Sequence, residues 1–216
     1  MSGWTDTLKD VPMPNFTDIT GLAGVASAGA AALLLMPGIM RLSRSRLTLL
    51  QGSVFALLLI PFGGLPLAGY LRGVTGDLSI TTLVMIGCAL SGSGFCCDSN
   101  KPGSRRALLN LVTLVALPLY PLSLGLTAFD PYRLGFGDSL FVAVLLLFAL
   151  AAWILKHYLT AFCISLAILA WSTGWYESGN LWDYLLDPWV AIYGLSVLAL
   201  HGMKSIWQFV KSYQPR

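Results

Sequence analysis

Long apolar runs separated by short polar turns fill most of the chain. A membrane-crossing helix needs about 20 mainly apolar residues, and the pattern allows about seven runs of this length or slightly shorter. They cover residues 21–40, 47–71, 78–97, 107–129, 139–155, 158–171 and 188–203. The pattern therefore predicts an all-α, polytopic transmembrane helical bundle at residues 19–203, between a polar tail at 1–18 and a basic tail at 204–216.

Prolines and glycines interrupt two of these runs. Residues 61–66 read Pro-Phe-Gly-Gly-Leu-Pro within the second run, and Pro118 and Pro121 lie within the fourth. Proline removes a backbone donor and clashes with the preceding turn, so both helices are expected to be kinked or broken. The first run carries small residues at Gly24, Ala28 and Ala32, a spacing that favours the close approach of another helix.

Composition supports the membrane prediction. Hydrophobic residues make up 56% of the 216 residues and charged residues only 11%. A soluble domain carries roughly 25% charged residues, so an ordinary soluble globule is excluded. The 13 basic residues are spread over short turns and are not gathered on one face, so no nucleic-acid partner is expected. The predicted partner of the apolar surface is the lipid bilayer.

The charges divide between the two sides that the runs define. When the turns are assigned alternately, nine of the ten acidic residues fall on one side and ten of the 13 basic residues on the other. The basic side holds Arg41, Arg44, Arg46, Lys101, Arg105, Arg106, Lys156, Lys204, Lys211 and Arg216. Basic loops stay cytoplasmic, so we expect the N-terminus outside and the C-terminus inside. From the class of protein we expect a bacterial inner membrane.

A weak internal repeat accompanies this pattern. An offset of about 60 residues aligns Arg41 with Lys101, Arg46 with Arg106, Pro61 with Pro121, Arg72 with Arg133 and Asp77 with Asp138. A duplicated helical hairpin would produce this alignment, and chance together with common turn chemistry is the alternative. Two predicted outer turns, at residues 72–77 and 133–138, share the pattern Arg-x-x-x-Gly-Asp.

The acids and arginines of the outer side have a structural and a functional interpretation. Asp18, Asp77, Asp138 and Asp187 each stand just before an outer-side run, where a carboxylate caps free N–H groups. Arg72 and Arg133 lie on the predicted outer side, although basic residues normally concentrate in cytoplasmic loops. Each lies five residues before an aspartate. Pairing within each turn is the favoured explanation. The alternative is an anion site, because arginine offers a bidentate fork and broken helices line polar cavities.

Residues 135–138, Gly-Phe-Gly-Asp, fit the pattern GxGD and resemble over these four positions the intramembrane aspartyl proteases, including prepilin peptidases. The resemblance implies two aspartates that activate water, with Asp138 and Asp77 as the pair. The sequence departs from the prepilin-peptidase pattern because Ser139 stands where a lysine is expected. The motif is also predicted on the outer side, whereas that family cuts at the cytoplasmic side. Protease activity therefore ranks last among the candidate functions.

Other catalytic patterns are missing from the sequence. Cys96, Cys97, His157 and His201 have no metal-binding spacing such as CxxC or HxxxH, so neither a metal nor a cofactor is expected. No phosphate-binding GxxxxGK[ST] loop is present, and the histidines are predicted on the side opposite to nearly all the acids. The runs also lack ionisable residues near mid-bilayer, which weakens the case for ion-coupled transport.

These observations predict a multi-pass inner-membrane protein without an evident catalytic centre. We expect an accessory or assembly component of lipid or glycan processes in the envelope, which contacts a larger membrane protein or an anionic lipid or glycan headgroup. The alternative is a small transporter or flippase that uses the two outer arginines and the kinked helices. The segment 177–187 is predicted to lie flat at the interface as an aromatic-rich amphipathic turn. The wider aromatic and acidic turn 171–189 is the predicted partner surface, and an aromatic belt at the interface is the alternative. The candidate contact residues are Arg72, Asp77, Arg133, Asp138, Trp182 and Asp183.

Overall fold

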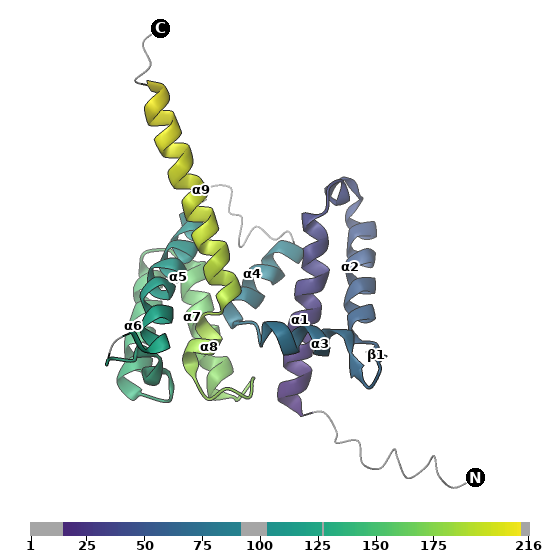
Figure 1. Cartoon of the computed structure of the whole chain (residues 1–216), viewed down its shortest axis with the longest axis horizontal. Helices are drawn as coiled ribbons and strands as arrows, with labels where there is room; N and C mark the ends of the chain where they lie inside the picture. The colour runs from purple at the N-terminus through teal and green to yellow at the C-terminus, as the bar shows by residue number, and fades with distance from the viewer. Residues whose placement is uncertain (1–14, 92–102, 127, 213–216) are drawn as a thin grey trace, which may run out of the picture.

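A computed structural model describes residues 15–91, 103–126 and 128–212, and these residues form an all-α fold with one minimal β-hairpin (Figure 1). The predicted all-α class is confirmed. The helices are α1 (Phe16–Ala32), α2 (Arg44–Leu59), α3 (Leu67–Thr75), α4 (Ile80–Ser91), α5 (Gly103–Pro121), α6 (Ser139–Ile154), α7 (Tyr158–Ser172), α8 (Leu181–Leu185) and α9 (Pro188–Ser212). Most of the polar tail, and Cys96, Cys97, Asp98 and Lys101 of the third run and the turn after it, lie outside the described residues.

Within the described residues, three helical stretches are long and apolar enough to cross a membrane: Phe16–Leu35, Ser104–Leu126 and Pro188–Gln208. The apolar helices α6 and α7 have 16 and 15 residues, fewer than the roughly 20 that a full crossing needs, and the described part of the apolar helix α4 has 12. The start of α1 and the end of α9 lie at opposite ends of the molecule (Figure 1). The count of seven crossings and the N-out orientation remain predictions.

The second run is broken where its prolines and glycines predict. Helix α2 ends at Leu59, and strands β1 (Pro61–Phe62) and β2 (Leu65–Pro66) then pair around Gly63 and Gly64. Both glycines have positive φ, 64° and 98°, a conformation that costs glycine least. The chain continues as α3, which crosses α1 and α2 instead of extending α2 (Figure 1).

The fourth run is disturbed near its end. Helix α5 contains Pro118 and Pro121 and passes into the π-helical turn η3 (Leu122–Leu126). Each proline deprives the helix of one i→i−4 hydrogen bond, and a π turn is a common form of local widening. Gly125, with φ of 85°, marks the kink inside the turn. The predicted disturbance is therefore confirmed as a widened helix end.

The helices form two lobes joined by α4. The hairpin lobe (α1–α3) has a small core around Val25, Ala26 and Ala68, whereas the bundle lobe (α4–α9) has a large core centred on α7. Helix α4 contacts α1 on one side and α7 on the other. Close approach at Gly24 is confirmed, because a Cβ there would lie 3.3 Å from the side chain of Leu83 on α4.

Candidate functional site at the acidic end

Several elements that are distant in sequence meet at one end of the bundle. They are the start of α1, the α3–α4 junction, the 3₁₀ turn η4 (Pro131–Gly135), the segment with α8 and the start of α9. Asp18, Asp77, Asp183 and Asp187 all take part in these contacts. We call this region the acidic end.

Arg72 is bound by two carboxylates at the acidic end. Its Nε lies 2.6 Å from Asp77 Oδ1, Nη2 lies 2.9 Å from Asp77 Oδ2, and Nη1 lies 3.0 Å from Asp18 Oδ1. Gly21 of α1 makes room for the pair, since a Cβ there would overlap both side chains. The hydrogen bond to Asp77 raises the pKa of Arg72 above its ordinary value, against the opposing effect of burial. The predicted pairing of Arg72 with Asp77 is confirmed.

Asp187 joins the starts of two helices. Its Oδ1 accepts a hydrogen bond of 2.8 Å from the Val190 amide in α9, and its Oδ2 accepts one of 2.7 Å from the Ser79 amide just before α4. The side chain is almost fully buried. The predicted capping role of Asp187 is confirmed. The predicted capping by Asp77 is not found among the described residues: Asp77 accepts from Arg72, and the amide of Ser79, two residues later, is bonded to Asp187.

Asp183 binds the turn η4 to the segment around α8. Both of its oxygens accept from the Tyr132 hydroxyl, at 2.8 and 2.9 Å, and Oδ2 also accepts from the Ser178 hydroxyl. Trp182 Nε1 donates to the Pro131 carbonyl at 3.1 Å. Burial, followed by the hydrogen bond to Asp183, raises the pKa of Tyr132.

The segment 177–187 does not lie flat at the surface, because most of it is buried, so this prediction is wrong. Tyr176, Leu181 and Tyr184 are buried and belong to the core of the bundle lobe. The Tyr184 hydroxyl accepts from the Tyr176 amide at 3.0 Å and donates to the carbonyl of Tyr176 or Ser178, both 3.1 Å away. Because these contacts satisfy the backbone internally, the segment folds back into the bundle.

The second Arg-x-x-x-Gly-Asp turn differs from the first. Arg133 and Asp138 are exposed, and both ion pairs within the described part of the chain belong to Arg72. Asp138 Oδ1 caps α6 by accepting from the amides of Leu140 and Phe141 at 2.8 and 3.0 Å. The capping prediction is confirmed at Asp138, whereas the predicted pairing of Arg133 is not found. Gly135 packs beneath Asn180 so closely that a Cβ would overlap the amide oxygen.

A cavity of about 480 Å³ opens among these groups. We call it the acidic-end cavity. It is lined by Thr75, Gly76, Asp77, Leu119, Tyr120, Ser123, Tyr132, Tyr176, Ser178, Trp182, Leu186, Asp183, Asp187 and Pro188. Carboxylates, hydroxyls and aromatic rings are present, without histidine, lysine or cysteine. Of the candidate contact residues, the structure brings Asp77, Trp182 and Asp183 together here, with Arg72 behind Asp77. Asp138 does not line the cavity, so the aspartate pair implied by the GxGD resemblance does not share it.

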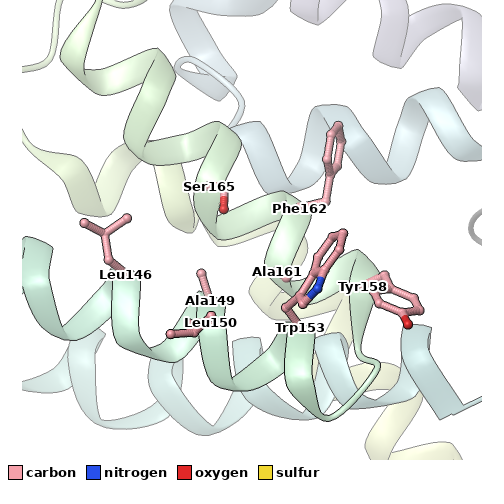
Figure 2. Close-up of a pocket in the computed structure, with 8 residues that line it drawn as sticks. All are labelled: Leu146, Ala149, Leu150, Trp153, Tyr158, Ala161, Phe162 and Ser165. Carbon is pink, nitrogen blue, oxygen red and sulfur yellow. The ribbon is translucent and has the colours of Figure 1, made fainter.

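An apolar groove of about 750 Å³ lies between α6 and α7 (Figure 2). Trp153 and Tyr158 close one end of it, with ring centroids 5.1 Å apart, and Ala149 and Ala161 form its floor. Ser165 provides the only side-chain oxygen besides that of Tyr158 among the lining residues. The groove therefore fits a lipid-facing surface better than a reaction site.

Sequence reasoning missed the residues that complete the cavity. Asp187 was assigned only to capping, and Tyr120, Tyr132 and Tyr176 were not singled out. Their partners lie far away in sequence, as in the Tyr132 to Asp183 bond across 51 residues, so no local pattern identifies them. Comparison of the chain with protein-family models, curated proteins and solved structures found no match.

Proposed function

We propose that this chain is a non-catalytic, multi-pass integral protein of a bacterial inner membrane. It serves as an accessory or assembly component in lipid or glycan processes of the envelope and uses the acidic-end cavity as its binding site. The observation that carries the proposal is the cavity itself, which is built by side chains from several separate elements. Hydrogen bonds hold its carboxylates in place, and pre-formed concave sites with a few fixed polar groups are typical of binding.

The lining chemistry supports binding over reaction. Asp77 is paired with Arg72, Asp187 with two backbone amides, and Asp183 with two hydroxyls. Nucleophilic catalysis needs a nucleophile held next to a general base, and these carboxylates are engaged in holding the fold together.

Capture of a membrane partner tests the proposal. The tagged full-length protein is cross-linked in native membranes and purified, next to Tyr120→Trp, which fills the cavity, and Leu150→Phe, which alters the groove of Figure 2. The partner should be lost with Tyr120→Trp and retained with Leu150→Phe. Topology reporters fused after Ser43 and after Gly179 should report opposite sides. Equal capture by both variants, or autonomous turnover by the purified protein, would contradict the proposal.

A small transporter or flippase is the second candidate. The breaks at residues 60–66 and 118–125 favour it, because interrupted helices are common where a substrate passes. The simplest transporter mechanism would have Arg72 and Arg133 bind the anionic group of a substrate. The guanidinium of Arg72 already donates to Asp18 and Asp77, which argues against that mechanism. Unchanged lipid translocation in vesicles after Arg72→Gln and Arg133→Gln would remove its main support.

A further inference from the structure

The acidic-end cavity borders a second cavity of opposite character. This apolar cavity of about 220 Å³ lies between α5 and α6, with α7 as its floor. Helices α5 and α6 each pack against α7 and make little direct contact with each other. The cavity therefore reaches from the core to the apolar surface, where Val144 and Phe148 of α6 are about half exposed. We call it the α5–α6 cavity.

Trp182 and Leu186 line both cavities. On one side of them stand carboxylates and tyrosine hydroxyls, and on the other stand aliphatic side chains with Phe141, Phe148 and Cys163. Together the two volumes fall within the range of roughly 300–1,000 Å³ that small-molecule sites occupy. A ligand that spans them must be apolar at one end and polar at the other.

The charge of the acidic-end cavity defines the polar end of such a ligand. Arg72 is the only cation bound to the carboxylates of this region among the described residues. Within the described part of the chain, Asp183 and Asp187 are bonded only to hydroxyls and amides, so no cation there balances their charges. The Tyr120 hydroxyl also lines the cavity, and the described residues offer it no hydrogen bond. Such surroundings disfavour an anionic group and favour a cation that donates hydrogen bonds, beside aromatic rings that also attract cations.

We propose that the two cavities form one binding site for an amphiphile, with an acyl chain in the α5–α6 cavity and an ammonium-bearing headgroup in the acidic-end cavity. The inference rests on the proposed function, because it names the ligand class of the same cavity. It is independent of Arg72 and Arg133, which the transporter hypothesis uses. Pro118, Pro121 and the π turn widen the end of α5, where Leu119, Tyr120 and Ser123 line the cavity.

Lipid competition in one membrane tests the proposal. The full-length protein is placed in nanodiscs with equal amounts of phosphatidylethanolamine, phosphatidylcholine and phosphatidylglycerol, and the lipids it retains are identified by native mass spectrometry. Phosphatidylethanolamine has an ammonium group with N–H donors, phosphatidylcholine has the same charge without donors, and phosphatidylglycerol has no cation. One phosphatidylethanolamine per chain should be retained in at least about threefold excess over each competitor, a modest difference in affinity.

Three variants locate the binding. Val144→Phe fills the α5–α6 cavity and should remove the retained lipid. Asp183→Asn keeps an oxygen for Tyr132 and Ser178 but removes the charge, and should bring phosphatidylethanolamine and phosphatidylcholine to parity. Leu150→Phe, in the groove of Figure 2, should change nothing. Circular dichroism confirms that each variant is folded, and if Val144→Phe fails this control, Asp183→Asn decides alone.

Retention in proportion to composition, or selectivity unaffected by the cavity variants, would overturn the lipid assignment. If partner capture remains sensitive to Tyr120→Trp in that case, the proposed function still stands. Selective retention of phosphatidylethanolamine combined with unchanged capture would instead support the lipid site and contradict the partner role.

Discussion

The two Arg-x-x-x-Gly-Asp turns share a sequence pattern and differ in structure. In both, the glycine before the aspartate has positive φ, 71° at Gly76 and 87° at Gly137. In the first turn the arginine lies in the last turn of α3 and holds the aspartate in a half-buried ion pair. In the second turn the arginine is exposed in η4, and the aspartate caps α6. The same residues thus tie α1 to the α3–α4 junction in one turn and begin a helix in the other.

The position of the next helix explains this difference. Helix α6 begins at Ser139, immediately after Asp138, so the carboxylate reaches the free amides of the first turn. Helix α4 begins only at Ile80, and the amide of Ser79 before it is bonded to Asp187. Asp77 therefore has no amide to cap and pairs with the nearest cation. Two extra residues between the motif and the helix change the role of its aspartate.

The largest expected effect comes from the third position of the motif. Gly135 is buried against Asn180, whereas the corresponding Val74 is 86% exposed. Gly135→Ala should lower the free energy of unfolding by about 3 kcal/mol, since it displaces a buried side chain that bonds Tyr132 and Trp182. Val74→Ala should change it by less than about 0.5 kcal/mol. Unfolding midpoints in detergent micelles measure both, and equal effects would mean that the second turn is not packed as described.

The second largest difference between the two turns is expected when their arginines are replaced. Arg72→Gln leaves Asp18 and Asp77 without their cation, at side-chain exposures of 36% and 25%. The free energy of unfolding should fall by on the order of 2 kcal/mol, a value between those typical of surface ion pairs and of buried ion pairs. Arg133→Gln, at an exposed position, should cost less than about 0.5 kcal/mol. The same unfolding measurement checks both variants. A large loss of stability for Arg133→Gln would mean that Arg133 makes a stabilising contact and that the two turns differ less than described.

The sequence allowed the fold class, the breaks at Pro61 and Pro121 and the capping by Asp138 and Asp187 to be predicted, because local chemistry determines each of them. Contacts between segments that are distant in the chain could not be predicted, because no local sequence pattern encodes them. Asp18 binds Arg72 across 54 residues, and Ser79 binds Asp187 across 108. The duplicated hairpin remains a prediction: α2 and α5 begin at nearly equivalent positions, yet α1 packs on α2 whereas α4 packs on α1 and α7.

Variants of Asp77 and Asp138 test ion pairing against helix capping, with smaller expected changes in the free energy of unfolding. Asn caps a helix about as well as Asp, so Asp138→Asn should leave the stability nearly unchanged, while Asp138→Ala should cost about 1 kcal/mol. Asp77→Asn should cost more than Asp138→Asn, because it removes a charge from the Arg72 pair. Unfolding midpoints of the three variants give the ranking. The reverse order for the two Asn variants would mean that the roles of the aspartates are exchanged.

The smallest expected effect appears at alkaline pH, where each turn has a tyrosine beside it. Burial raises the pKa of Tyr132, near the second turn, and of Tyr176, whose hydroxyl donates to the Leu78 carbonyl next to Asp77. In the unfolded chain both ionise near pH 10. A raised pKa in the folded state means that their contribution to stability is complete below about pH 10 and is lost as the pH rises through the folded pKa.

A titration of tyrosinate absorbance in the folded protein should therefore show a group of tyrosines that ionises well above the exposed ones. Tyr132→Phe and Tyr176→Phe should each remove part of that late step. Asp183→Asn should shift the Tyr132 contribution to lower pH, because the hydrogen bond to the carboxylate adds to the effect of burial, and leave Tyr176 unaffected. If all tyrosines instead titrate together near the ordinary value, the tyrosines beside the two turns are not enclosed as their hydrogen bonds require. The contrast between the half-buried Asp77 and the exposed Asp138 then loses its physical basis.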